Sequence, residues 1–225
     1  MSLTGAKSKA VYFAETVFLY LLSAAAIHCA LLLSAKAGLF DSSNRMFGLW
    51  RLNPYLTIPY LSATFLGMVT VPLVWERAVR KVGFTTIGFA APRNFARESA
   101  NAAILFFLFV VYPYIFSSAR NKFMELSYPT MMSLAGCWLF VALSEEVLYR
   151  GIIQRRLCNL SGKYSGLIFA SIVFAFVGHC KAPVMDNLIL RLPFGLILGY
   201  IYLRTRSLVL PVAMHWGFNV LFASY

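Results

Sequence analysis

The chain has 225 residues, of which 60% are hydrophobic and only 12% are charged, and its mean hydropathy is +0.72. Because an ordinary soluble domain is about one quarter charged, this composition excludes a typical water-soluble protein and indicates an integral membrane protein. The net charge of +12 does not indicate a nucleic-acid partner, because the Lys and Arg residues lie in short links between apolar runs. That pattern is typical of cytoplasmic membrane anchoring.

Seven apolar runs follow one another along the chain and predict an all-α, polytopic bundle of about seven membrane spans. A helix needs about 20 apolar residues to cross a bilayer. The approximate ranges of the runs are 11–34, 55–75, 100–117, 130–157, 165–180, 188–203 and 211–225. We expect a single integral membrane domain over residues 1–225. We expect no cleavable signal peptide, because the first run is long enough to span and no small-residue cleavage site follows it.

The links between the runs predict the orientation of the bundle. With the N-terminus in the cytoplasm, the inside segments carry more Lys and Arg than the outside segments, as the positive-inside rule favours. We therefore expect a multi-pass protein of an inner or plasma membrane, with a cytoplasmic N-terminus. The most basic link, 76–98, contains an apolar stretch at 82–89 that is too short to span. This stretch predicts a small element that lies on the membrane surface.

Two adjacent carboxylates, Glu145 and Glu146, interrupt the fourth run, and no other two acidic residues of the chain are adjacent. An acidic side chain at the bilayer centre costs about 2.5–3.5 kcal/mol, so the pair is expected to serve a function. On a helix, Arg150 lies four residues after Glu146 and can pair with it. Glu145 points about 100° away and is left free as a base. The structural alternative is a salt bridge that pins two spans together.

The later runs supply partners for these carboxylates. His179 ends the fifth run, and His215 and Asn219 lie four residues apart on one face of the seventh. Hydrogen-bonding groups on one intramembrane face can stabilise an oxyanion, although they can equally hold helices together, and a histidine at a span end can be merely interfacial. Taken together with Glu145, they form the set of groups that hydrolysis of an amide by an activated water requires.

The glycines of the sixth run and the four cysteines are expected to have structural roles. Gly195 and Gly199 lie four residues apart in the sixth run and predict close helix packing. The four cysteines show no metal-ligand spacing and behave as apolar fillers. We expect no cofactor, because the chain has no HExxH helix, although two histidines and carboxylates could bind zinc.

Three motifs, in this order, resemble those of the CAAX-processing and bacteriocin-processing superfamily, also called the abortive-infection family. The motifs are Glu145-Glu146-x-x-x-Arg150, His179, and His215-x-x-x-Asn219. This superfamily of intramembrane endopeptidases includes the Ras-converting prenyl-protein protease. The resemblance covers about residues 133–222, and the first 120 residues match only as generic spans. One position departs from the family: a phenylalanine is usual four residues before the second-motif histidine, where this chain has Ala175.

The resemblance implies an intramembrane protease with its catalytic core in the last four spans. The implied roles are a general base at Glu145 with His179 as its partner, an oxyanion hole at His215 and Asn219, and a supporting pair at Glu146 and Arg150. A metal requirement has been argued both ways for the family, and we favour the metal-free, glutamate-dependent mechanism.

The implied substrate is a membrane-anchored protein or peptide that is cut near its C-terminus, prenylated CAAX proteins being the best-known example. Alternatives are an outward-facing protease that processes C-terminal sorting signals, and a non-proteolytic membrane protein that acts as an immunity or scaffold factor. A small transporter that uses Glu145 and Glu146 as a proton relay is disfavoured, since neither repeated halves nor broken helices are visible in the sequence.

Overall fold

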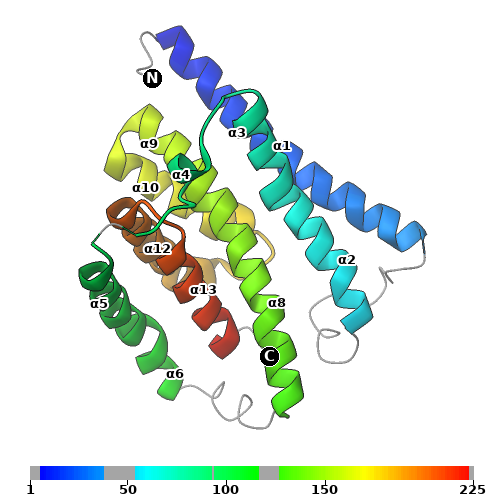
Figure 1. Ribbon diagram of the computed structural model, residues 1–225, viewed down its shortest axis with the longest axis vertical. Coiled ribbons are helices and arrows are strands. Elements are labelled where there is room, and N and C mark those ends of the chain that lie inside the picture. The colour runs from blue at the N-terminus through cyan, green and yellow to red at the C-terminus, as the bar shows by residue number, and fades with distance from the viewer. Residues whose placement is uncertain (1–5, 38–53, 93, 117–126, 223–225) are drawn as a thin grey trace.

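The computed structural model describes residues 6–37, 54–92, 94–116 and 127–222. These residues form helices and no strand (Figure 1), so the predicted all-α transmembrane bundle is confirmed. The physical reason is that a backbone in hydrocarbon has no water to bond, and a helix satisfies its own N–H and C=O groups.

Most of the helices are long and contain a π-helical stretch. The first helix is α1 (Ala6–Lys36). The second is continuous from α2 (Pro54–Phe65) through η2 (Leu66–Thr70) into α3 (Val71–Ala78), and the short α4 (Phe84–Ile87) follows it. The next is continuous from α5 (Phe95–Phe106) through η3 (Phe107–Val111) into α6 (Tyr112–Ile115). The second half forms α8 (Tyr128–Glu146), η4 (Val147–Gln154) and α9 (Arg155–Ser161), then α10 (Lys163–Ile172) and η5 (Val173–Gly178), then α11 (Val184–Asp186), η6 (Asn187–Arg191) and α12 (Leu192–Thr205), and finally α13 (Val209–Phe222).

Five of these helices are long and apolar enough to cross a membrane. They are Ser8–Lys36, Ile58–Ala78, Phe95–Ile115, Met131–Ser161 and Val184–Thr205, and they correspond to five of the seven predicted spans. The predicted fifth and seventh spans correspond to two shorter apolar helices, Lys163–Gly178 and Val209–Phe222.

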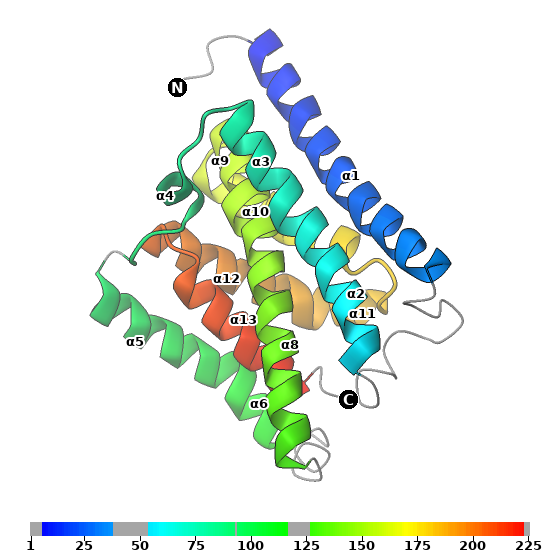
Figure 2. The same cartoon turned by 45° about the vertical axis from the view of Figure 1, so that its right-hand side comes forward.

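Helix α8 runs through the middle of the bundle (Figure 1). Helices α1, α2 and α3 lie on one side of it, and α13, α12 and α5 lie on the other, an arrangement that the turned view in Figure 2 repeats. Helix α8 packs directly against both α2 and α13. The two carboxylates at the end of α8 therefore face other helices of the protein.

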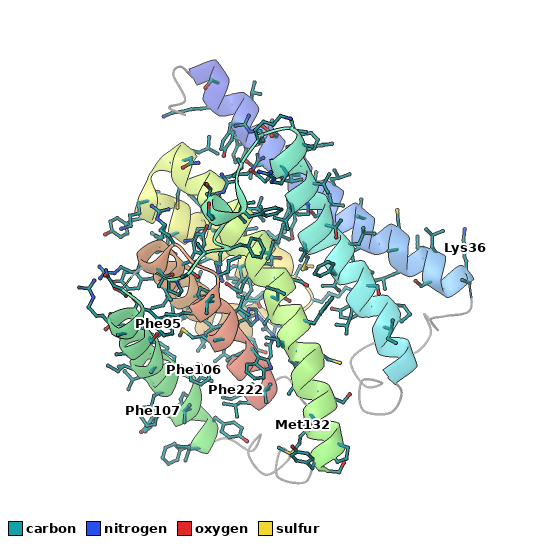
Figure 3. The ribbon with its side chains drawn as sticks, viewed as in Figure 1. Lys36, Phe95, Phe106, Phe107, Met132 and Phe222 are labelled. Carbon is teal, nitrogen blue, oxygen red and sulfur yellow. The ribbon has the colours of Figure 1, made fainter. Side chains whose placement is uncertain are left out.

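The outer faces of the bundle are apolar, as lipid contact requires. Phe107 points away from the bundle and is 49% exposed, whereas its neighbour Phe106 turns inward against α13 (Figure 3). Met132 at the foot of α8 is also half exposed. Exposed side chains of this kind would be costly in water and cost nothing against lipid tails.

The short apolar stretch 82–89 packs against the bundle. Ile87 in α4 is fully buried, and its carbonyl oxygen accepts a hydrogen bond from the hydroxyl of Tyr202 at 2.8 Å. The carbonyl of Gly88 accepts one from the N–H of Leu208 at 3.0 Å, and the φ of Gly88 is +119°, which favours glycine. A four-residue helix cannot satisfy its own carbonyl groups. The carbonyl oxygens at the end of α4 therefore accept hydrogen bonds from α12 and from the turn that follows α12.

A buried ion cluster joins the N-terminal helices to the second half of the chain. Glu76 in α3 is 1% exposed and accepts hydrogen bonds from Arg155 at 2.5 Å and from Arg156 at 2.6 Å. Arg156 also donates to Glu15 in α1 at 3.1 Å. Because a buried charge without a partner is costly, these contacts fix α1 and α3 against α9.

Candidate active site

Glu145 and Glu146 are the last two residues of α8, where the helix widens into the π-helical segment η4. Every residue of η4 is buried. Short π-helical segments occur frequently at functional sites. Here the segment carries Tyr149 and Arg150 into the same buried region as the two carboxylates.

Glu146 is completely buried and both of its oxygen atoms are engaged. Oε2 accepts a hydrogen bond from Nε of Arg150 at 3.0 Å, at the helical spacing noted in the sequence. Oε1 lies 2.8 Å from Nδ1 of His215, which comes from α13. A carboxylate with two such partners is stable in a buried position because each contact compensates for lost water.

Glu145 differs from its neighbour in exposure and in bonding. Its side chain is 16% exposed, and its Oε2 lies 3.7 Å from Nε2 of His215. That separation exceeds a hydrogen bond, and Oε2 has no hydrogen-bond partner among the residues described. Of the two carboxylates, Glu145 is therefore the one with a buried oxygen that is still free to accept a hydrogen bond.

His215 lies between the two carboxylates and is held there by aromatic rings. It is 4% exposed, and its ring meets Phe174 and Phe194 edge to face, at centroid distances of 5.9 and 5.8 Å. Asn219, one turn later on α13, is 7% exposed. The polar face predicted for the last span is thus buried, and its histidine reaches the carboxylates of α8.

His179 comes from the end of η5, a different segment from those that carry the carboxylates and His215. It follows η5, is partly buried, and its Nδ1 lies 2.9 Å from the carbonyl oxygen of Phe174. A carbonyl can only accept, so Nδ1 carries the proton, and Nε2 of the neutral ring is free to accept one. Over the described part of the chain, no ion pair joins His179 to Glu145. The structure thus brings His215, and not the His179 implied by the resemblance, closest to Glu145.

Phe174 is the centre around which the site residues gather. Its ring contacts those of His179 at 4.9 Å, Tyr149 at 5.2 Å and His215 at 5.9 Å. The guanidinium carbon of Arg150 lies 4.9 Å from the same ring. Nη1 and Nη2 of this arginine have no hydrogen-bond partner among the described residues, so the ring face provides electrostatic compensation for the buried cation.

Two tyrosines that sequence reasoning did not single out also belong to this region. Tyr149 is 2% exposed, and its hydroxyl lies so close to Gly178 that a side chain there would collide with it. The side chains of Tyr149 and Tyr20 share a hydrogen bond, and both lie within electrostatic range of Glu145. The position of Tyr149, one turn after Glu145, could have identified it. Tyr20 comes from α1, and nothing in its local sequence points to the site.

Gly195 and Gly199 lie where α12 contacts its neighbours. A Cβ atom on Gly195 would come within 3.3 Å of Phe174 and Ser171. One on Gly199 would collide with Leu167 and with Gln154, whose Nε2 donates to the Gly199 carbonyl oxygen at 2.9 Å. The absence of side chains at both positions allows α12 to approach the site closely.

The part of the chain that the structure describes contains no group of three or more His, Cys, Asp or Glu residues that could hold a metal ion. Cys29, Cys137, Cys158 and Cys180 are free thiols.

Comparison with known proteins relates the second half of the chain to one family. Residues 126–221 match the family described as Rce1-like, type II CAAX prenyl endopeptidase. The matched region contains all three motifs and nearly coincides with the range 133–222 over which the resemblance was expected. Searches of curated proteins and of solved structures give no significant match.

Proposed function

We propose that this chain is an intramembrane endopeptidase that cuts a membrane-anchored protein or peptide near its C-terminus. The support is the match of residues 126–221 to the Rce1-like family of type II CAAX prenyl endopeptidases, the superfamily that its three motifs predicted. The substrate reaches the site from the bilayer, and the attacking water is activated by Glu145 and a histidine. The best-known substrate class of the superfamily, a prenylated C-terminal segment, is the first to be tested.

The observation that carries this proposal is the unequal state of the two carboxylates. Glu146 is fully buried and bonded to Arg150 and His215, whereas the side chain of Glu145 is 16% exposed and its buried Oε2 has no donor among the described residues. A general base must have a free acceptor within reach of water. Glu145 has the free acceptor, and in our proposal the substrate-bound site admits the water, while Glu146 serves to orient its neighbours.

The rest of the site can supply the remaining parts of the reaction. The buried amide of Asn219 is a neutral donor for the oxyanion that forms when water attacks the peptide carbonyl. His179 and His215 each have one ring nitrogen, Nε2, for which no hydrogen bond is present within the described part of the chain. Water attacks directly, so the mechanism needs no covalent acyl-enzyme and, in our proposal, no metal ion.

We further propose a multi-pass location in an inner or plasma membrane, with the N-terminus in the cytoplasm. This orientation follows from the basic links, and the ion cluster agrees only with the grouping of the links on one side. Glu15 and Glu76 join Arg80, Arg155 and Arg156, so three segments assigned to the same side meet in space. An outward-facing protease that processes sorting signals would require the opposite orientation.

The experiment that tests the function compares the wild type with Glu145→Ala and His179→Ala. Purified proteins are incubated with farnesylated CAAX peptides, and cells that express each form are compared by C-terminal proteomics. We expect both variants to insert and fold but to lose cleavage, so that an uncut C-terminus accumulates in the cells. If Glu145→Ala retains full cellular function, the protein is a non-proteolytic scaffold or immunity factor and the proposal is wrong.

A further inference from the structure

We propose that Asn187, a residue outside the three motifs, is a positioning residue of the site that holds His179 in place through the backbone carbonyl group of that histidine. Arg191 supports Asn187 by fixing the direction of its side-chain amide. The positioning of His179 follows from contacts within the protein, whereas its consequence for cleavage rests on the proposed proteolytic function.

Asn187 differs from its sequence neighbours in burial. It is the first residue of η6 and is 2% exposed. The structure describes every residue from 176 to 193, and Asn187 is the only one of them that is buried. In such a stretch an apolar side chain is normally the one that turns inward, and a buried amide is stable only when its polar atoms are bonded. The contacts of this amide therefore explain its burial.

The amide of Asn187 is bonded at both of its polar atoms. Nδ2 donates to the carbonyl oxygen of His179 at 3.1 Å, and Oδ1 accepts from Nη1 of Arg191 at 3.2 Å. A carbonyl oxygen can only accept, and a guanidinium can only donate. Turning the amide over would place two acceptors together and two donors together. Arg191 thus keeps the NH₂ group of Asn187 directed at His179.

His179 is the residue at which the backbone leaves η5. Its φ is −120° and its ψ is 38°, which are not helical values, and the last carbonyl groups of a helix have no partner within it. The carbonyl oxygen of His179 accepts from the N–H of Ala182 at 3.0 Å as well as from Asn187. Both lone pairs of this oxygen are then used, so the backbone at His179 cannot turn without breaking a hydrogen bond.

Two further contacts fix the ring of His179 and the backbone before it. Nδ1 lies 2.9 Å from the carbonyl oxygen of Phe174. The preceding residue, Gly178, packs directly against the hydroxyl of Tyr149, which belongs to the segment η4 that follows the carboxylates. Nε2 is the ring nitrogen without a hydrogen bond in the described part of the chain. Its direction is therefore set by the contacts of Phe174, Tyr149 and Asn187.

A buried asparagine can also do no more than hold two segments together, here η5 and η6. Loss of such a bond would lower stability without a selective effect on the imidazole of His179. Asn187→Asp separates the two roles, because the introduced carboxylate has the same shape and still accepts from Arg191 but cannot donate to the carbonyl of His179. The two facing acceptors repel, so the backbone at His179 moves while the bond to Arg191 is kept.

The position of His179 can be measured without any substrate. The chain has three histidines, so ¹⁵N-histidine labelling of the full chain in detergent micelles gives three imidazole patterns in long-range ¹H–¹⁵N spectra, and His28→Gln and His179→Gln assign two of them. We expect wild-type His179 to carry its proton on Nδ1, bonded to Phe174. In Asn187→Asp we expect this tautomer of His179 to lose population, because the ring leaves the Phe174 carbonyl, while the pattern of His28 stays as in the wild type.

The consequence for cleavage is measured with a farnesylated CAAX peptide. We expect Asn187→Asp to lower kcat per folded molecule about 10²-fold, as a misplacement of about 1 Å can do, with little change in KM. Arg191→Met leaves the amide free to turn over, so it should lower kcat by a smaller factor, and it decides the same point if Asn187→Asp does not fold. Asn159→Asp is the matched control, because it makes the same substitution at an exposed position in α9 and leaves the pattern of His179 and kcat unchanged.

The outcomes distinguish this proposal from the proposed function. The proposal is overturned if Asn187→Asp, or Arg191→Met in its place, leaves the pattern of His179 as in the wild type. It is also overturned if His28 changes to the same extent, which would show a general loss of structure. A changed pattern of His179 with kcat within about twofold of the wild type would mean that the position of this ring has no part in the reaction. If the wild type cleaves no peptide or cellular protein, the proteolytic function fails, whereas the spectra still decide whether Asn187 holds His179.

Discussion

Phe174 lies one π-helical turn before His179, and its ring packs against the imidazole at a centroid distance of 4.9 Å. The resemblance places an aromatic residue four residues before this histidine, where the chain has the fully buried Ala175. In a π-helix the backbone hydrogen bond joins residues five apart, one more than in an α-helix. The segment Val173–Gly178 therefore brings Phe174 to the face that a residue four positions earlier would occupy in an α-helix.

Restoring the family spacing should consequently not restore the site. We expect the double substitution Phe174→Ala with Ala175→Phe to unfold the protein more readily and to abolish cleavage, because Ala175 has no space for a ring and overpacking alone costs about 1–3 kcal/mol. Thermal unfolding in detergent and peptide cleavage check this. Phe176→Leu is the control, since Phe176 is only partly buried. Activity in the double variant equal to that of the wild type would show that the π-helical turn has no role.

Gly199 should be the least tolerant of the glycines in α12. A Cβ atom there collides with Leu167 and with Gln154, so Gly199→Ala is expected to destabilise the protein by about 1–3 kcal/mol. Gly136→Ala provides the matched control, because nothing lies within 4 Å of the added atom and alanine favours a helix by about 0.8–1.0 kcal/mol over glycine. The two variants should shift the melting temperature in opposite directions. Equal shifts would contradict the close packing of α12.

Glu76 should be essential for stability and not for chemistry. Glu76→Gln leaves Arg155 and Arg156 without their closest buried partner, and breaking a buried ion pair typically costs about 3–5 kcal/mol. We expect a large loss of thermal stability, with kcat per folded molecule unchanged. Active-site titration of the folded fraction separates the two effects. A fall in kcat that equals the loss in Glu145→Ala would mean that the cluster is part of the site.

The hydrogen bond between Tyr20 and Tyr149 should couple α1 to the site. Tyr149→Phe and Tyr20→Phe should each lower stability by about 1 kcal/mol, and the double variant should cost no more than one of them, because both remove the same bond. Denaturant unfolding of the four forms measures this. Tyr200→Phe, at an exposed position, serves as the control. Additive effects would show that the two hydroxyl groups act independently.

Cleavage should not depend on a metal ion. Glu145, Glu146 and His215 gather together, but they do not form a group able to hold a metal among the described residues, and Glu146 is occupied by Arg150. We expect 1,10-phenanthroline to leave kcat unchanged. Loss of activity with the chelator and its recovery with zinc would require a different mechanism.

Several features of this protein could be predicted from local sequence. Long apolar runs can only be satisfied as helices in hydrocarbon, so composition and hydropathy were sufficient for the fold class. The spacing of Glu146 and Arg150 predicted their pairing, because residues four apart share a helix face. The order of the three motifs predicted the family, which the match over residues 126–221 confirmed.

Other features depend on contacts between distant segments and have no local signal. The approach of His215 to Glu145 depends on how α13 packs against α8, and the contribution of Tyr20 depends on where α1 lies. The ion cluster of Glu15, Glu76, Arg155 and Arg156 joins residues that are far apart in the chain. The π-helical turn before His179 places the aromatic residue that packs on this histidine five positions before it. A prediction based on 3.6 residues per turn would look for that residue four positions before it.

The sequence by itself therefore determined that this is a helical membrane protein, that its second half resembles the CAAX-protease superfamily, and which polar residues are unusual within its apolar runs. Only the tertiary structure decided which contacts each of these residues makes. It fixed Glu146 between Arg150 and His215 and left Oε2 of Glu145 without a donor among the described residues. The reason is that the bonding of a buried carboxylate is set by the side chains that neighbouring helices bring to it, and helical periodicity in one segment does not specify them.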